Sequence, residues 1–401
     1  MFIGVNNVAR KIKNCYVGVN GTARKVKAVY VGVNGVARLV WQSIIKKVTS
    51  FSGQTSVGSV DNGYSVTEVQ HMYKIDDNHI IFGTYSAYSG SLRRCFLYNC
   101  YLDNNGAVTS FTSFETNYES SSSFQTNIFG ISKFNDSIGV CVYQTTGPSS
   151  IRKMCLFSLA SSNSKLYETQ MAPTTDEVLS IIPLGNDTIM IATRSDSGGL
   201  HGTFYRCENN TSVWKSMEYL SPYVSGRVTY GTPIVFLLSN NRLGVVSQMK
   251  YEYYDDGYTL VVSIYNYSFD ASNNITISQV SNTIIPYANV YKSISLDNDH
   301  VVLLGTTAIG LYINSNNTIT YTNYLGFSAG ACTRIGTSNS ICSSSGGSLS
   351  ILYYDFDNNT ISQTGSGTSS TYSIYSVPYK NDSVLQGRGA SIVYLDKLTF
   401  S

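Results

Sequence analysis

The chain has 401 residues, of which only 13% are charged, and it contains 32 tyrosines and 33 glycines. This length allows one or two domains with a large core, and the abundance of strand-forming and turn-forming residues favours an all-β protein. Neither a run of 18 apolar residues nor the apolar core of a signal peptide is present in the sequence, so membrane insertion and a signal peptide are not expected.

Charge is distributed unevenly along the chain. Residues 1–47 contain nine Lys or Arg and no acidic residue, whereas residues 48–401 contain 18 basic and 25 acidic residues. A segment of net charge +9 therefore precedes a body of net charge −7, and the two are expected to contact different partners. Nucleic-acid binding by the basic segment is not expected, because its charges alternate with valines as on a solvated or protein-docking sheet.

A segment of fourteen residues occurs three times, back to back, at the start of the chain. The copies read FIGVNNVARKIKNC, YVGVNGTARKVKAV and YVGVNGVARLVWQS, beginning at Phe2, Tyr16 and Tyr30. Each copy predicts a β-hairpin, because Asn20-Gly21 and Asn34-Gly35 suit the type I′ turn, in which both central residues have positive φ.

Three hairpins of this size have too little core to be stable alone. Residues 1–42 are therefore predicted to form an attachment module that packs on copies of itself, in a homo-oligomer, or on a partner. In the third copy Leu39-Val40-Trp41 makes apolar a face of the hairpin that would otherwise be solvated. This change favours packing of the third hairpin on the next domain. The residues expected to make the attachment are Tyr16, Arg24, Lys25, Lys27, Tyr30, Arg38 and Trp41.

The repeated sequence of residues 2–41 is similar to repeats at the ends of structural proteins from phages and prophages of gut Firmicutes. The resemblance covers about a tenth of the chain. It implies a virion-associated protein, made in the bacterial cytoplasm and attached to other virion proteins through residues 1–42. It implies nothing about a ligand site.

The rest of the chain, residues 43–401, contains a looser repeat in which a polar pair such as Asn240-Asn241 precedes a short apolar strand. Asn and Asp tolerate left-handed backbone, so the pairs predict hairpin turns. Units spaced by roughly 40 to 58 residues match four-stranded blades, and seven units predict a seven-bladed β-propeller. The predicted strands are 79–86, 137–144, 188–195, 242–249, 300–307, 340–347 and 383–390. No WD dipeptide or kelch pattern assigns the units to a propeller family.

The last unit lacks an outermost strand before the chain ends. Residues 44–51, IIKKVTSF, form a predicted strand with no blade of its own. We expect this strand to complete the seventh blade and close the ring, which removes exposed sheet edges.

The sequence contains little that indicates catalysis. His79 and His300 both follow a polar turn pair, so they are expected to be structural. No Cys/His cluster predicts a metal site, and neither a cofactor nor a catalytic residue is expected. The protein is predicted not to be an enzyme.

A tyrosine-rich loop is the best candidate for binding. It runs from residue 250 to 258, between two strands of the fourth unit. Its adjacent carboxylates suit hydrogen bonds to sugar hydroxyls or the binding of Ca²⁺, and its tyrosines add flat apolar faces with polar tips. The predicted ligand-binding residues are Tyr251, Tyr253, Tyr254, Asp255, Asp256 and Tyr258. Tyrosines in the links between blades, at 219, 223, 230, 287 and 291, are expected on the same face.

Three functions remain open from the sequence. The first is a virion adhesin, such as a tail fibre or decoration protein, whose propeller binds a host cell-surface glycan or protein. The second is a scaffold or decoration protein of the particle that binds no ligand. The third is a glycan-cleaving propeller, which would need two carboxylates flanking one glycosidic bond.

Overall fold

The structure is a computed structural model. It describes residues 2–5, 8–11, 16–19, 22–25, 28–33, 36–42, 47–61, 63, 68–88, 92–119, 127–145, 151–160, 164–171, 177–195, 199–220, 227–229, 231–251, 258–345, 347–369, 375–380, 382–390 and 392–401. Up to residue 46 only the backbone of the strands is described. Within these ranges every regular element is a β-strand, and no helix long and apolar enough to cross a membrane occurs in them.

Contacts divide the chain into two units, Met1–Lys47 and Val48–Ser401, so the division falls after Lys47 rather than after residue 42. In the first unit the described strands pair antiparallel in twos. The pairs are β1 (Phe2–Val5) with β2 (Val8–Lys11), β3 (Tyr16–Val19) with β4 (Thr22–Lys25), and β5 (Ala28–Val33) with β6 (Val36–Gln42). The predicted turn residues at 20–21 and 34–35 lie outside the described residues.

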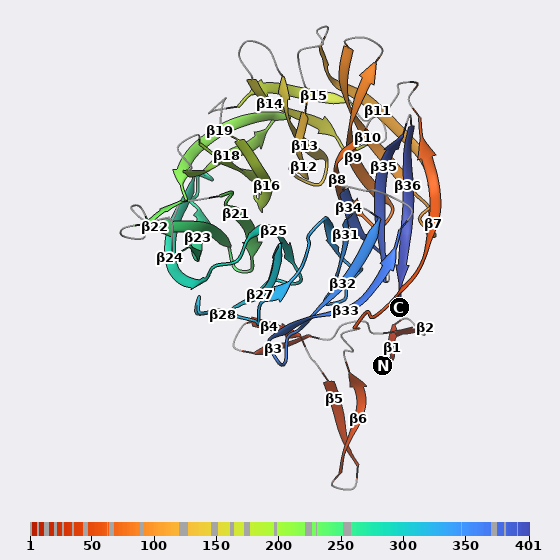
Figure 1. The fold of residues 1–401 in the computed structure, drawn as a ribbon, viewed down its shortest axis with the longest axis vertical. Helices are drawn as coiled ribbons and strands as arrows, with labels where there is room; N and C mark the ends of the chain where they lie inside the picture. Colours follow the sequence, from red (N-terminus) through yellow and green to blue (C-terminus); the bar gives the residue numbers. More distant parts are fainter. Residues whose placement is uncertain are drawn as a thin grey trace. The chain divides into compact units, whose positions relative to one another are not determined.

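The second unit is a seven-bladed β-propeller, as the sequence predicted (Figure 1). Blade 1 contains β8 (Glu68–Asp76), β9 (His79–Tyr88), β10 (Leu92–Leu102) and β11 (Val108–Glu119). Blade 2 contains β12 (Asn127–Lys133), β13 (Ile138–Thr145), β14 (Ile151–Ser158) and β15 (Lys165–Gln170). Blade 3 contains β16 (Glu177–Gly185), β17 (Thr188–Arg194), β18 (Leu200–Glu208) and β19 (Thr211–Tyr219).

The inner strand of blade 4 is split into two parts, which both pair with the second strand. This blade contains β20 (Arg227–Thr229), β21 (Ile234–Leu238), β22 (Arg242–Tyr251), β23 (Thr259–Phe269) and β24 (Ile275–Pro286). Blade 5 contains β25 (Val290–Ser295), β26 (His300–Gly305), β27 (Thr307–Ile313), β28 (Ile319–Tyr321) and the short β29 (Leu325–Gly326). Blade 6 contains β30 (Ala331–Arg334), β31 (Ser340–Ser345), β32 (Ser348–Asp355) and β33 (Thr360–Thr368).

Blade 7 joins the two ends of the propeller. It contains β34 (Tyr375–Tyr379), β35 (Ser383–Ala390), β36 (Ile392–Phe400) and, as its outermost strand, β7 (Phe51–Val60). The predicted position of this closing strand, 44–51, is wrong, because β7 begins only at Phe51. The prediction relied on the apolar residues of the segment 44–51. The outermost strand needs few apolar residues, because its residues are exposed or half-buried except Val60 at its end, which is fully buried.

The segment just before β7 anchors the start of the propeller instead of pairing as a strand. Val48 is fully buried in the apolar cluster between blades 6 and 7, and its amide donates to Ser340 Oγ at 3.1 Å. The amides of Thr49 and Ser50 donate to the carbonyl of Ser401, at 2.9 and 3.0 Å. The start and the end of the propeller therefore lie together.

The two faces of the propeller carry different connections. We call the side with the first-to-second and third-to-fourth strand turns the turn face, and the side with the second-to-third loops and the links between blades the loop face. The predicted polar pairs lie on the turn face. Two of the pairs have the expected left-handed backbone, with φ of 50° and 51° at Asn186 and Asp187 and of 56° and 55° at Asn240 and Asn241.

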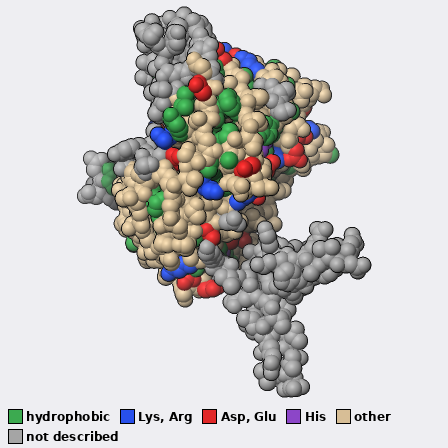
Figure 2. All heavy atoms as spheres, turned by 90° about the vertical axis from the view of Figure 1, so that its right-hand side faces the viewer, with side chains coloured by type: hydrophobic (Ala, Val, Ile, Leu, Met, Phe, Trp, Pro, Cys, Tyr) green, Lys and Arg blue, Asp and Glu red, His purple; other side chains and the backbone are tan. Residues whose placement is uncertain are grey.

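The core lies between the blades. Among the described residues, each pair of neighbouring blades encloses one apolar cluster. None of the cysteines in the described ranges forms a disulfide, and five of them are buried. The surface has few charges, and Figure 2 shows a face on which uncharged polar groups and backbone surround scattered charged side chains.

Candidate functional site

The predicted binding loop is only partly described. Tyr251 ends β22, but the structure does not describe its side chain. Tyr253, Tyr254, Asp255 and Asp256 lie outside the described residues. Tyr258, which precedes β23, is described and is partly buried. The structure therefore does not place the carboxylate pair, and the site is built from the tyrosines around Tyr258.

Tyr258 lies against a tyrosine from the next link between blades. The ring centroids of Tyr258 and Tyr287 are 5.2 Å apart, with an angle of 43° between the planes. Tyr287 lies in the link between blades 4 and 5 and is 39% exposed. The two rings thus come from different connections of the loop face, as the sequence predicted.

Two further tyrosines extend this group. The hydroxyl of Tyr324 donates to the carbonyl of Pro286 at 2.9 Å, one residue before Tyr287. Tyr291 is 42% exposed, and its hydroxyl donates to the carbonyl of Ala329 at 2.8 Å. We call Tyr258, Tyr287, Tyr291 and Tyr324 the tyrosine cluster. Tyr258 and Tyr287 lie in loop-face connections, whereas Tyr291 is in β25 and Tyr324 lies between β28 and β29.

The hydroxyls of Tyr291 and Tyr324 remain protonated at neutral pH. Burial raises the pKa of Tyr291, and burial with the nearby Tyr321 raises the pKa of Tyr324 to about 12. Because both hydroxyls donate to backbone carbonyls, the rings are held in place and present flat apolar faces with their polar tips already bonded. Tyr324 packs on the apolar cluster between blades 4 and 5, so the exposed rings of Tyr287 and Tyr291 are the faces that suit the apolar side of a sugar ring or an apolar side chain of a protein.

The other predicted tyrosines of the loop face are not part of this cluster. Tyr219 ends β19 and is 63% exposed, with its ring 5.6 Å from that of His201. Tyr223 and Tyr230 lie outside the described residues. The side chains of all predicted attachment residues, from Tyr16 to Trp41, are likewise not described, and Lys27 lies outside the described backbone.

The two histidines of the repeat are structural, as predicted. His79 stacks on Tyr101 with centroids 4.6 Å apart, and His300 stacks on Tyr312 at 4.7 Å. In both blades the histidine starts the second strand and its ring partner lies opposite it on the third strand. The same geometry in two blades shows a repeated packing unit.

No metal-binding cluster is found where side chains are described. No group of three or more His, Cys, Asp or Glu residues in these parts of the propeller is arranged to hold a metal ion. The described part of the loop face thus offers rings and hydrogen-bonding groups for recognition. Sequence reasoning missed Tyr324, which lies between β28 and β29 and whose hydroxyl contacts Pro286 at the end of β24.

Comparisons with known proteins support the fold. No protein-family model matches the sequence, and no curated protein matches it. The WD40 repeats of RRP9 align over 88% of this chain and 99% of that chain, with a TM-score of 0.54 and 9% identity. A periplasmic gluconolactonase from Pseudomonas aeruginosa aligns over 80% of this chain and 88% of that chain, with a TM-score of 0.50 and 8% identity. At such low identity these likenesses show a shared β-propeller fold alone.

Proposed function

We propose that this chain is a virion-associated phage structural protein whose propeller binds a glycan or protein of the host surface through its loop face. The N-terminal repeats, a module of three β-hairpins, hold the protein to other virion proteins. The resemblance of residues 2–41 to phage and prophage structural proteins supports the virion part of this proposal.

The observation that carries the proposal is the polarity of the propeller. Thr49 and Ser50 bond to Ser401, and the amide of Phe400 donates to the carbonyl of Asp382 at 2.9 Å, in the first turn of blade 7. Both ends of the propeller therefore lie on the turn face. A tether that leaves from the turn face keeps the loop face, which carries the tyrosine cluster, available for a ligand.

Weak binding at each propeller is sufficient for this role. A few aromatic faces bind a saccharide with low affinity, but many copies on one particle raise the overall avidity by about 10²–10⁴ without any new contact.

The test is the binding of fluorescent full-length protein, presented on multivalent beads, to a panel of gut Firmicutes. A Tyr258→Ser/Tyr287→Ser variant lacks both aromatic rings. It is expected to bind cells about tenfold or more weakly, as is typical when a central aromatic residue of an interface is removed. The control is Trp214→Ser, which removes an exposed aromatic ring from β19, outside the tyrosine cluster, and is expected to leave binding unchanged.

Three outcomes would contradict the proposal. Failure of the wild type to bind any member of the panel would favour the scaffold without a ligand. Equal binding by the double variant would exclude the tyrosine cluster. Release of oligosaccharides from wall polysaccharide, lost in an Asp255→Asn/Asp256→Asn variant, would identify an enzyme.

A further inference from the structure

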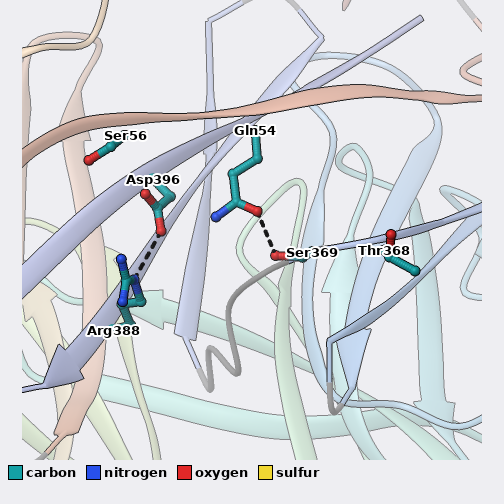
Figure 3. Close-up of a pocket in the computed structure, with 6 residues that line it drawn as sticks. All are labelled: Gln54, Ser56, Thr368, Ser369, Arg388 and Asp396. Atoms are coloured by element: carbon teal, nitrogen blue, oxygen red, sulfur yellow. Dashed lines mark hydrogen bonds and ion pairs between the residues drawn. The ribbon is translucent and has the colours of Figure 1, made fainter.

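A second candidate site lies between blades 6 and 7. A cavity of about 600 Å³ opens there, toward the loop-face ends of the strands. This volume is within the range of about 300–1,000 Å³ that is typical of small-molecule sites. All six lining residues have polar side chains, and they come from β7, β33, β35, β36 and the residue after β33: Gln54, Ser56, Thr368, Ser369, Arg388 and Asp396 (Figure 3).

The cavity interrupts a layer that is apolar in most blades. The fourth residue of each second strand faces the preceding blade. In blades 1 to 5 this residue belongs to the apolar clusters, as Phe82, Cys141, Ile191, Val245 and Leu303. Blade 6 has Ser343 at this position, and blade 7 has Gln386. The polar, hollow interface is therefore a local departure from the repeat.

The next position of the second strand that faces the preceding blade differs even more between blade 7 and the other blades. Two residues later, blades 1, 3 and 4 have the fully buried Thr84, Thr193 and Ser247, whereas blade 7 has Arg388. The side chain of Arg388 is 38% exposed, and its Nε donates to Asp396 Oδ2 at 3.3 Å. The side chain of Asp396 is only 4% exposed.

The arginine is held in place but keeps hydrogen-bonding capacity. The guanidinium carbon lies 4.4 Å from the centre of the Tyr394 ring, a cation–π contact that fixes its plane. Among the described residues, the two terminal nitrogens of Arg388 have no hydrogen-bond partner. The buried carboxylate of Asp396 needs this cation, but the ion pair uses only Nε of the guanidinium.

The remaining lining groups are close to this pair. Gln54 Oε1 accepts a hydrogen bond from Ser369 Oγ at 3.1 Å, which links β7 to the end of blade 6 (Figure 3). Ser56 and Thr368 are exposed and place hydroxyls at the cavity. The six lining residues together carry no net charge, because Asp396 neutralises Arg388.

We propose that this cavity binds a neutral saccharide through two adjacent hydroxyls. A hydroxyl both donates and accepts, so one pair of hydroxyls can donate to the Asp396 carboxylate and accept from the terminal nitrogens of Arg388. A carboxylate ligand would accept from Arg388 but would be repelled by Asp396. Ser56 and Thr368 provide further hydrogen bonds to a polyhydroxylated ring. This site is separate from the tyrosine cluster and does not depend on it.

Saturation-transfer NMR on the full chain tests the site directly. The probes are methyl glycosides of glucose, galactose, mannose and N-acetylglucosamine, with glucuronic acid and N-acetylneuraminic acid as acidic counterparts. Arg388→Lys keeps the charge but removes the forked donors, and Thr368→Trp fills the cavity from an exposed position. Arg194→Lys is the matched control, because Arg194 is also in a second strand and pairs with Glu177 at 2.7 Å.

At least one neutral glycoside is expected to bind the wild type. Its affinity is expected to fall by about tenfold in Arg388→Lys, as for the loss of charged hydrogen bonds, to vanish in Thr368→Trp and to stay unchanged in Arg194→Lys. Failure of every neutral glycoside to bind, binding that survives in Thr368→Trp, or binding of the acidic sugars alone would overturn the proposal.

The result also separates this site from the proposed function. Host-cell binding that depends on the tyrosine cluster, without any glycoside signal, would refute the cavity site and leave the proposed function intact. Glycoside binding that depends on Arg388, without binding to any host cell, would support the cavity site and refute the proposed function.

Discussion

His71 has a pKa that its surroundings lower strongly. Its ring, on the inner strand β8, lies 4.6 Å from that of Tyr375. Burial, followed by the nearby charge of Lys292, lowers the pKa of His71 to about 4. The residue is therefore neutral at pH 7, whereas an unfolded chain would protonate it near pH 6.5.

Acid is expected to weaken the fold through this residue. As the pH falls from about 6.5 to about 4, the unfolded chain takes up a proton that folded His71 does not, which costs up to about 3 kcal/mol of stability. A His71→Gln variant does not titrate here, so its stability should fall less than that of the wild type between pH 7 and pH 5. Urea unfolding at both pH values measures the difference, and equal losses would show that His71 titrates normally.

Arg242 connects blades 4 and 5 from a buried position. Its side chain is 4% exposed and pairs with Asp299 at 3.0 Å. It also donates to the carbonyl of Asn314 at 2.7 Å and to Asn317 Oδ1 at 3.0 Å. Removing it would leave these acceptors without their donor, which is more costly than the pair itself is favourable.

An Arg242→Met variant is therefore expected to lose about 2–4 kcal/mol of unfolding free energy. The control is Arg194→Met, which breaks the half-exposed pair with Glu177 and should cost about 1 kcal/mol or less. Chemical denaturation of both variants is the measurement, and similar losses in the two would contradict the assignment of Arg242 as a link between blades.

At the scale of elements, the sequence predicted the second strand of every blade. All seven predicted ranges overlap β9, β13, β17, β22, β26, β31 and β35. These strands are buried and follow a polar turn pair, so both a hydrophobic signal and a turn signal mark them. The strongest part of the repeat therefore corresponds to the most buried strand.

The sequence did not predict the irregular parts of the blades. The inner strands of blades 1, 2, 3 and 5 carry a bulge at similar positions. Bulges depend on pairing with a neighbouring strand, and no residue type in the chain marks them. The closing strand was misplaced for a related reason, since an exposed outermost strand needs little apolar character.

The candidate sites were predictable to different degrees. Tyr258 and Tyr287 come from connections that the repeat itself places on one face, so their proximity could be predicted. The cavity could not be, because Gln54 and Ser369 are 315 residues apart and meet only when the ring closes. Arg388 and Asp396 look like ordinary strand residues until their burial is known.

The position of β7 as the outermost strand of blade 7 can be tested by truncating the chain before and after it. Removal of residues 1–47 leaves β7 and Val48 in place, so the truncated propeller should remain folded and soluble. Removal of residues 1–60 exposes the edge of β36 and opens the ring, so this variant should aggregate or unfold at much lower denaturant. Equal behaviour of the two truncations would contradict the role of β7.

At the scale of the whole molecule, the direction of the chain gives the propeller two unlike sides. Val48 and Ser401 are on the turn face, and the tyrosine cluster is on the loop face. This polarity supports the proposal that the propeller is held from one side and binds from the other.

Coupling the full-length protein to beads from opposite sides tests that claim most directly. Biotin at the C-terminal Ser401 leaves the loop face outward, whereas biotin on a non-natural residue at position 328, an exposed site in the link between blades 5 and 6, turns the loop face toward the bead. We predict that beads coupled through Ser401 bind host cells about fivefold or more better. Equal binding by the two kinds of bead, or stronger binding by those coupled through position 328, would contradict the account.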